Sequence, residues 1–188
     1  PHYHPAMKHV QPIRQSLDFR TAFNVLGPLA NPAKAHAQVL GVAEEALMPR
    51  MIETLKMLGL KRAMVVHSNG LDEISTMCNT KVMHLEDGEV RTDEIDPTQY
   101  GIRIADFNEL AGGDAPTNAA IVREVLSGND ISAKKDIILL NAAAAIIVSG
   151  LAKDFVDGIE KADQAITSGA AMECLEKLVH ISNHEAQD

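Results

Sequence analysis

The chain has 188 residues, 46% of them apolar and 23% charged, with a formal net charge of -9. This balance is typical of a globular domain with a buried core and does not resemble a disordered tail. An acidic chain without a run of Lys and Arg does not fit a protein that binds nucleic acid through phosphate contacts.

The apolar and cysteine patterns indicate a cytoplasmic protein without a membrane span. The longest apolar stretch, Ile137 to Val148, is interrupted by Asn141 and is shorter than the roughly 20 residues that cross a bilayer, so we expect a buried helix. Cys78 and Cys174 lack metal-type spacing and fit a reducing compartment. No secretory signal is visible. The chain starts at Pro1 rather than Met, so we expect a fragment, a processed chain or a sequence that begins within a longer protein.

The first third is predicted to contain a helix, a shaped loop and a strand–helix–strand unit. Apolar residues recur with helical spacing over 10–23, and two prolines with a glycine fix the path of 24–32. A strand over 38–43, an amphipathic helix over 44–58 and a strand over 62–67 follow. The two strands should pair in parallel through a right-handed crossover.

The remainder is predicted to form a hairpin and then helices. Strands over 81–85 and 89–95 flank an Asp-Gly turn, and we expect this hairpin to be peripheral. Further helices are expected through Leu126 with Asp114 as cap, from Ser132 or Asp136 to Val148, from Phe155 to Ile166 and from Gly169 to Val179, with Gly158 and Gly169 as weak points. The predicted fold is α/β, one domain over residues 1–188, with a mixed, largely parallel sheet flanked by helices.

Two adjacent carboxylates follow the second predicted strand. The apolar run from Ala63 ends at Asn69-Gly70, and Asp72 and Glu73 come next. Ligands bind at this rim of open α/β sheets, and paired carboxylates suit Mg²⁺ that also holds phosphate oxygens. The alternative is a solvated turn, because Asn, Gly and Asp are common in turns for backbone reasons.

A cationic patch opens the chain. It comprises His2, His4, Lys8, His9 and Arg14. Set against the Gly27-Pro28 loop, this patch suits a small anion, and Arg14 can hold a carboxylate through two parallel hydrogen bonds. A solvated basic helix face is the alternative, and a zinc site is not favoured because the histidines lack helical ligand spacing.

Two further polar features are interpreted as structural. The Gly112-Gly113 turn could receive a phosphate at a helix start, but Asp114 already fills that position as a cap. Asn141 must find a hydrogen-bond partner if it is buried, so we expect it to tie a loop to its helix. No Ser-His-Asp or Cys-His arrangement is visible, so covalent catalysis is not expected.

Five strings of residues together carry a family resemblance. They are Y-H-P-A-M-K-H-V, P-I-R, R-T-A-F-N-V-L-G-P-L-A-N-P, V-V-H-S-N-G-L-D-E-I-S and L-L-N-A-A-A-A. The chain resembles the anthranilate phosphoribosyltransferases of tryptophan biosynthesis nearly end to end. The resemblance implies the C-terminal domain fold shared by nucleoside phosphorylases and phosphoribosyltransferases. It also implies transfer of phosphoribose from phosphoribosyl pyrophosphate to anthranilate, with Mg²⁺ as cofactor.

The resemblance also implies site residues. It assigns anthranilate to Arg14 at the carboxylate, to Gly27 and Pro28 near the ring, and to His4 in the same tunnel. It assigns Mg²⁺ to Asp72 and Glu73 on the pyrophosphate side of the donor. No catalytic base is implied, because the aniline nitrogen is already nucleophilic and placement supplies most of the rate.

The chain also departs from the family pattern. The N-terminal helical lobe of the family is absent, as are its Gly-Thr-Gly-Gly-Asp, Asn-x-Ser-Thr and Lys-His-Gly-Asn donor loops. We therefore expect an incomplete lobe that is inactive alone, from a protein that forms a homodimer when complete. Two alternatives remain open: a relative of the pyrimidine nucleoside phosphorylases, and a non-catalytic relative that binds nucleic acid.

Overall fold

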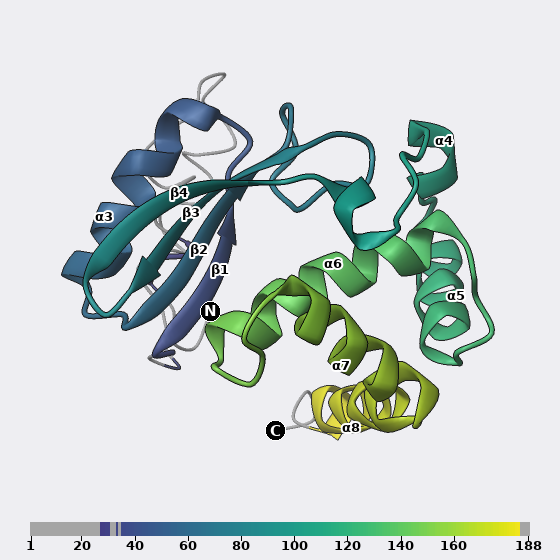
Figure 1. Cartoon of the computed structure of the whole chain (residues 1–188). Coiled ribbons are helices and arrows are strands. Elements are labelled where there is room, and N and C mark those ends of the chain that lie inside the picture. The colour runs from purple at the N-terminus through teal and green to yellow at the C-terminus, as the bar shows by residue number, and fades with distance from the viewer. Residues whose placement is uncertain (1–26, 31–32, 34, 185–188) are drawn as a thin grey trace, which may run out of the picture.

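The computed structural model describes residues 27–30, 33 and 35–184, and it places a four-stranded sheet between helices (Figure 1). The strands are β1 (Ala37–Gly41), β2 (Arg62–His67), β3 (Thr80–Glu86) and β4 (Glu89–Ile95), in the spatial order β1-β2-β3-β4. The expected mixed α/β architecture is confirmed. The predicted helix over 10–23 lies outside the described residues.

The predicted strand–helix–strand unit is confirmed. A 3₁₀ turn, η1 (Glu45–Leu47), leads into α3 (Met48–Met57), and β1 pairs with β2 in parallel. The apolar stripe of α3 packs on one face of the sheet, where Ile52 and Leu55 are fully buried. Burial of such a side chain contributes about 1.5–3 kcal/mol, so this stripe holds α3 on the sheet.

The predicted hairpin forms, but it is not peripheral. Asp87 and Gly88 take positive φ angles of 48° and 88°, as a tight turn requires. β3 lies between β2 and β4 and is antiparallel to both, and its Val82 and Leu85 are buried on opposite faces. The hairpin therefore completes the core. Among the described strands, one of the three pairings is parallel and two are antiparallel, so the expected "largely parallel" sheet is wrong in that detail.

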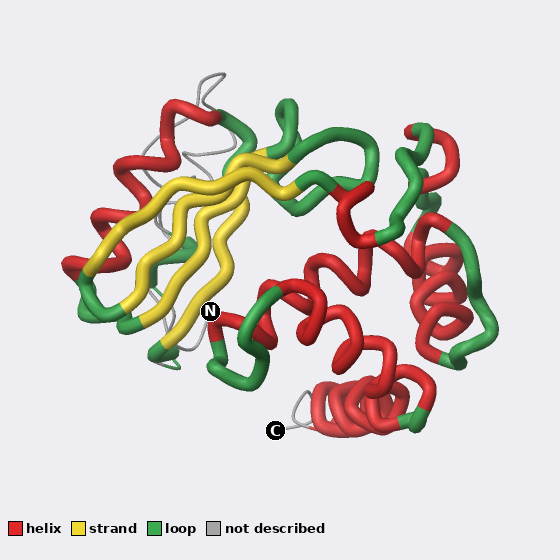
Figure 2. Tube along the Cα trace, viewed as in Figure 1, coloured by secondary structure: helices red, strands yellow, loops and turns green. Residues whose placement is uncertain are grey.

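A layer of helices covers the other face of the sheet and extends beyond it (Figures 1 and 2). Its elements are η2 (Pro97–Tyr100), α4 (Phe107–Leu110), α5 (Ala115–Leu126), α6 (Ala133–Val148), α7 (Phe155–Thr167) and α8 (Ala170–His184). Asp114 caps α5 by accepting a hydrogen bond from the Thr117 N–H at 3.0 Å. Ser132, rather than Asp136, caps α6. No helix in the described ranges combines the length and the apolar character that a bilayer span needs.

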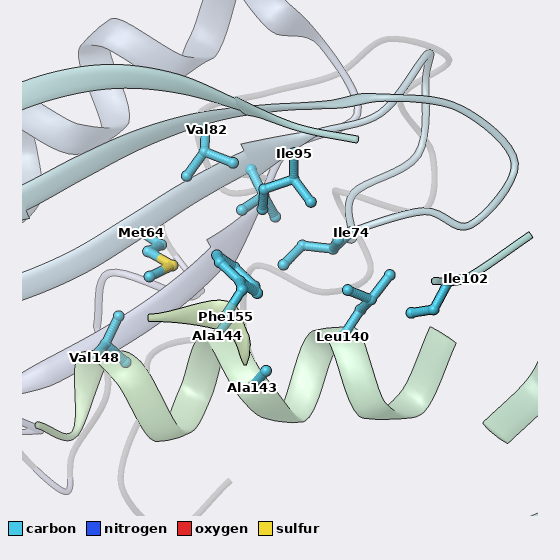
Figure 3. Close-up of a cluster of buried hydrophobic side chains, with 11 residues drawn as sticks. Met64, Ile74, Val82, Ile95, Ile102, Leu140, Ala143, Ala144, Val148 and Phe155 are labelled. Atoms are coloured by element: carbon cyan, nitrogen blue, oxygen red, sulfur yellow. The ribbon is translucent and has the colours of Figure 1, made fainter. Parts of the chain in front are cut away.

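The main core lies between the sheet and α6 (Figure 3). Met64 and Val82 from the sheet meet Leu140 and Ala144 of α6, and Ile74 fills the space beyond the strand ends. Helix α7 crosses α6 closely at Gly158, where an added Cβ would lie 2.9 Å from the Ala143 Cβ.

Close packing and turn geometry account for the two glycines that the sequence predicted as weak points. Gly158 gives up helix propensity, but its missing side chain allows the close contact between α6 and α7. Gly169 has a φ of 82° and lies in the turn between α7 and α8, a backbone conformation that glycine adopts readily.

Candidate functional site

The acidic pair lies just beyond the carboxyl end of β2, as the sequence predicted. After His67 the chain makes a tight turn that two backbone hydrogen bonds between Ser68 and Leu71 close, at 3.0 and 2.8 Å. Asn69 and Gly70 take positive φ angles of 45° and 91°. This turn directs Asp72 and Glu73 to the rim, the edge where ligands bind in open α/β sheets.

Gly41, the last residue of β1, accommodates the main chain of Asp72. A Cβ at position 41 would lie 1.5 Å from the Asp72 carbonyl oxygen and 2.3 Å from its carbonyl carbon. No side chain fits at that distance, so the contact requires glycine. It brings the acidic loop against the end of the neighbouring parallel strand.

Hydroxyl groups of Ser68, just after β2, and Thr80, the first residue of β3, fix the backbone from the Glu73 carbonyl group to the Ser75 N–H. Ser68 Oγ donates to the Glu73 carbonyl oxygen at 2.6 Å and lies 2.7 Å from Thr80 Oγ1. Thr80 Oγ1 accepts from the Ser75 N–H at 3.0 Å. Ser68, Ser75 and Thr80 are fully buried, and such satisfied buried polar groups favour a single loop conformation.

Asn141 of α6 binds both backbone polar groups of Ile74, the residue after Glu73. Its Oδ1 accepts from the Ile74 N–H at 3.0 Å, and its Nδ2 donates to the Ile74 carbonyl oxygen at 2.8 Å. Nδ2 also donates to the Ile137 carbonyl oxygen at 2.9 Å, one turn earlier in the helix. The prediction that Asn141 ties a loop to its helix is confirmed, and that loop is the one that carries the acidic pair.

The two carboxylates are a site of unbalanced negative charge. Both residues are exposed, and among the described residues no ion pair or hydrogen bond neutralises either side chain. Reduced hydration by the surrounding protein raises the pKa of Glu73, and the adjacent Asp72 carboxylate raises this pKa further. A cation bound here would relieve this repulsion.

The donor set fits Mg²⁺ that is shared with a ligand. Within the described ranges, no cluster of three or more His, Cys, Asp or Glu side chains could hold a metal alone. Two carboxylates on a fixed loop instead suit Mg²⁺, which commonly binds one or two carboxylates plus phosphate oxygens and water.

The predicted anthranilate residues are only partly described. Arg14 and His4 lie outside the described residues. Gly27 and Pro28 begin a turn in which the Ala30 N–H donates to the Gly27 carbonyl oxygen at 3.3 Å. The Pro28 carbonyl oxygen accepts from Gln38 Nε2 at 2.9 Å. Gln38 lies three residues before Gly41, about 10 Å along β1. No hydrogen bond among the described residues joins this turn to the acidic loop.

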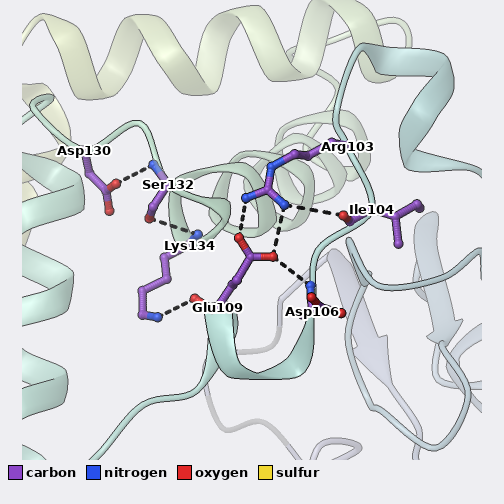
Figure 4. A network of polar contacts seen from close by, with 7 residues as sticks. All are labelled: Arg103, Ile104, Asp106, Glu109, Asp130, Ser132 and Lys134. Atoms are coloured by element: carbon purple, nitrogen blue, oxygen red, sulfur yellow. Dashed lines mark hydrogen bonds and ion pairs between the residues drawn. The ribbon is translucent and has the colours of Figure 1, made fainter.

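A separate polar network links α4 to the start of α6 (Figure 4). Arg103 forms a two-point ion pair with Glu109, whose carboxylate also accepts from the Asp106 N–H at 2.8 Å. These contacts lower the pKa of Glu109 to about 2, the Arg103 hydrogen bond being the largest cause. Lys134 donates to the Glu109 carbonyl oxygen. Each charged group has a partner, so the network is structural.

Gly41, Ser68 and Thr80, which fix the backbone of the acidic loop, were not predicted from the sequence. Gly41 carried one signal, since an isolated glycine within a strand pattern often marks a close backbone approach. Ser68 and Thr80 carried none, because the contact between them depends on the register of β2 and β3.

Comparisons with known proteins identify relatives of this chain. Residues 1–172 match the family model described as "Glycosyl transferase family, a/b domain". The anthranilate phosphoribosyltransferase of Methanocorpusculum labreanum is 47% identical over 180 residues, which are 96% of this chain and 53% of that protein. The chain thus spans about half the length of the curated relatives that it matches.

Solved structures of anthranilate phosphoribosyltransferases share this fold over about half of their length. The anthranilate phosphoribosyltransferase of Thermus thermophilus superposes with a TM-score of 0.86 at 37% identity, over 94% of this chain and 52% of that one. The Saccharomyces cerevisiae enzyme in complex with PRPP and Mg superposes with a TM-score of 0.83 at 33% identity, over 92% and 50%. Its complex with 4-fluoroanthranilate gives 0.85 at 32% identity, over 92% and 51%.

Proposed function

Because this chain belongs to the glycosyl transferase α/β-domain family, we propose that the protein carrying it transfers phosphoribose from phosphoribosyl pyrophosphate to anthranilate. The acidic loop after β2 is the observation that carries the proposal. It presents two carboxylates without a cationic partner among the described residues, on a backbone that Gly41 and Asn141 hold in place. Such a loop suits a metal that bridges protein and pyrophosphate oxygens.

Asp72 and Glu73 are the proposed Mg²⁺ ligands on the pyrophosphate side of the donor. Bound Mg²⁺ would stabilise the charge that develops on the leaving pyrophosphate. The chain contributes placement: the buried hydroxyls and Asn141 fix the loop, and the fixed loop fixes the carboxylates. The Saccharomyces cerevisiae relative in complex with PRPP and Mg supports Mg²⁺ as the cofactor.

Arg14, His4, Gly27 and Pro28 are the proposed anthranilate residues. Arg14 would pair with the substrate carboxylate, with the other three around the ring and its approach. The yeast relative with bound 4-fluoroanthranilate supports anthranilate as the acceptor. The matched relatives carry the transferase name, so a nucleoside phosphorylase or a nucleic-acid-binding relative is not favoured.

The proposed activity belongs to the protein at its natural length. Since the chain spans about half of its relatives, we expect the 188 residues alone to be inactive, and turnover by them alone would contradict this. We also propose a cytoplasmic homodimer for the natural-length protein. Two free cysteines are consistent with a reducing compartment, and light scattering would test the dimer.

The first experiment follows anthranilate fluorescence with the natural-length protein, phosphoribosyl pyrophosphate and Mg²⁺. Loss of fluorescence that needs both co-reactants supports the proposal, and no loss overturns it. Arg14→Ala should raise the KM for anthranilate with little change in the donor KM, because the acceptor carboxylate loses its charged partner. An equal rise of both values would show that Arg14 is wrongly assigned.

A further inference from the structure

A polar cavity lies at the opposite end of β2 from the acidic loop. It has a volume of about 220 Å³ between the hairpin and the end of α6, and Arg62, His84, Arg91 and Lys153 are among its lining residues. Arg62 begins β2, whereas the acidic loop follows His67. The five residue steps from Arg62 to His67 span about 16 Å along the strand, so this cavity is distinct from the proposed Mg²⁺ site.

The side chains of this cavity gather positive charge in an acidic protein. Three permanent cations, Arg62, Arg91 and Lys153, line it together with one carboxylate, that of Glu86. The chain as a whole carries a formal charge of -9. Among the described residues, no ion pair or hydrogen bond involves the Lys153 ammonium group. Arg91 is paired with Asp93, whose Oδ2 lies 3.2 Å from Arg91 Nη1, so the cations are only partly compensated. Positive charges that converge without full pairing repel one another, and an anion would relieve this repulsion.

Arg62 is held in place rather than extended into solvent. Its Nη2 donates to the Ser149 carbonyl oxygen at 3.0 Å, which satisfies one carbonyl at the end of α6. The guanidinium group lies so close to Gly150 that a Cβ there would be 2.3 Å from Nη1. Gly150 has a φ of 80°. The guanidinium therefore forms a fixed wall of the cavity, with further N–H donors beyond the one used on Ser149.

His84 supplies a second, independent sign of a missing ligand. The residue is 7% exposed, and its Nε2 has no hydrogen-bond partner within the described part of the chain. The nearest carboxylate oxygen, Oδ2 of Asp93, lies 3.9 Å away, beyond hydrogen-bond distance. Burial, and then the charge of Arg91, lower the pKa of His84 to about 4. A buried polar atom without a partner is uncommon in folded proteins.

We propose that this cavity binds a small anion of the phosphoryl class, held by Arg62, Arg91 and Lys153 with His84 as a further donor. Arginine matches the oxygen geometry of phosphate, and lysine adds a point charge. The volume is below the ~300–1,000 Å³ of pockets for drug-sized ligands, so the occupant is small. The inference does not depend on the proposed transferase activity.

The test is an NMR titration of the natural-length protein with inorganic phosphate at pH 7, without Mg²⁺. The ring C–H signal of His84, assigned by its loss in His84→Gln, reports on this cavity and not on the acidic loop. We expect a saturable shift of that signal. A parallel titration with glycerol phosphate shows whether the free ion or a phosphate monoester binds more tightly.

Two charge-matched variants make the result decisive. Arg91→Gln with Lys153→Gln should raise the half-saturation concentration at least fivefold. Lys56→Gln with Lys177→Gln removes the same charge from α3 and α8. This control variant should keep the half-saturation concentration within twofold of the wild-type value. Absence of a saturable shift with either ligand overturns the proposal. Equal weakening of anion binding in both variants also overturns the proposal. It would show that anions are attracted by the overall charge of the protein and not by this cavity.

Discussion

Replacing Asn141 with Ala tests how the acidic loop is held. The change removes both hydrogen bonds to the backbone N–H and carbonyl groups of Ile74, a fully buried residue. Each buried backbone group left without a partner costs about 1–3 kcal/mol. Asn141 itself is half-buried, so water can replace part of the loss, and Ala regains about 0.5 kcal/mol of helix propensity. We therefore expect the free energy of unfolding to fall by about 2–3 kcal/mol.

Asn118 offers a matched control on α5. Its side chain makes the same pair of bonds to one residue, accepting from the Gly113 N–H at 2.8 Å and donating to the Gly113 carbonyl oxygen at 3.0 Å. Both residues are exposed, so water replaces these bonds and Asn118→Ala should cost less than about 1 kcal/mol. Urea unfolding followed by circular dichroism measures both variants. Equal losses would refute the reasoning that burial of Ile74 gives Asn141 its effect.

Three other predictions concern close packing and a buried imidazole. Gly41→Ala forces a Cβ to 1.5 Å from the Asp72 carbonyl oxygen, so urea unfolding should show a loss of about 3 kcal/mol, and an unchanged stability would contradict the contact. Gly158→Ala places a Cβ 2.9 Å from the Ala143 Cβ of α6. After the gain in helix propensity, the net loss in the free energy of unfolding should be about 1–2 kcal/mol. A stabilised variant would show that the two helices move apart freely. The pKa of His84 is lowered to about 4 from 6.5 by burial and then Arg91, so the unfolded chain binds the proton first. The free energy of unfolding should thus fall by up to about 3 kcal/mol as pH drops from about 6.5 to 4. His84→Gln should remove this part of the pH dependence. Parallel curves of unfolding free energy against pH for the wild type and the variant would contradict the prediction.

Much of the fold could be predicted from local patterns. The Asp-Gly turn, the Asp114 cap and the strand over 62–67 are confirmed, because backbone geometry alone limits which residues fit there. The central place of the hairpin could not be predicted, since pairing between β2 and β3 depends on which hydrophobic faces meet in space.

The candidate site divides in the same way. Asp72 and Glu73 follow a readable strand and turn, so their place at the rim could be predicted, and a buried Asn in an apolar helix had to have a partner. The identity of that partner, Ile74, depends on how α6 lies beneath the loop. The contact between Gly41 and Asp72 and the cavity at His84 likewise join residues that are distant in sequence.

The acidic pair itself gives the most direct test of the proposed function. Asp72→Asn with Glu73→Gln in the natural-length protein should raise the Mg²⁺ and donor concentrations needed for half-maximal anthranilate consumption at least tenfold. The KM for anthranilate should stay within about twofold, because the pair binds the donor side. Glu173→Gln with Glu176→Gln on α8 removes the same charge and should change neither. Unchanged Mg²⁺ dependence in the loop variant, or an equal loss of donor and acceptor binding, would contradict the account.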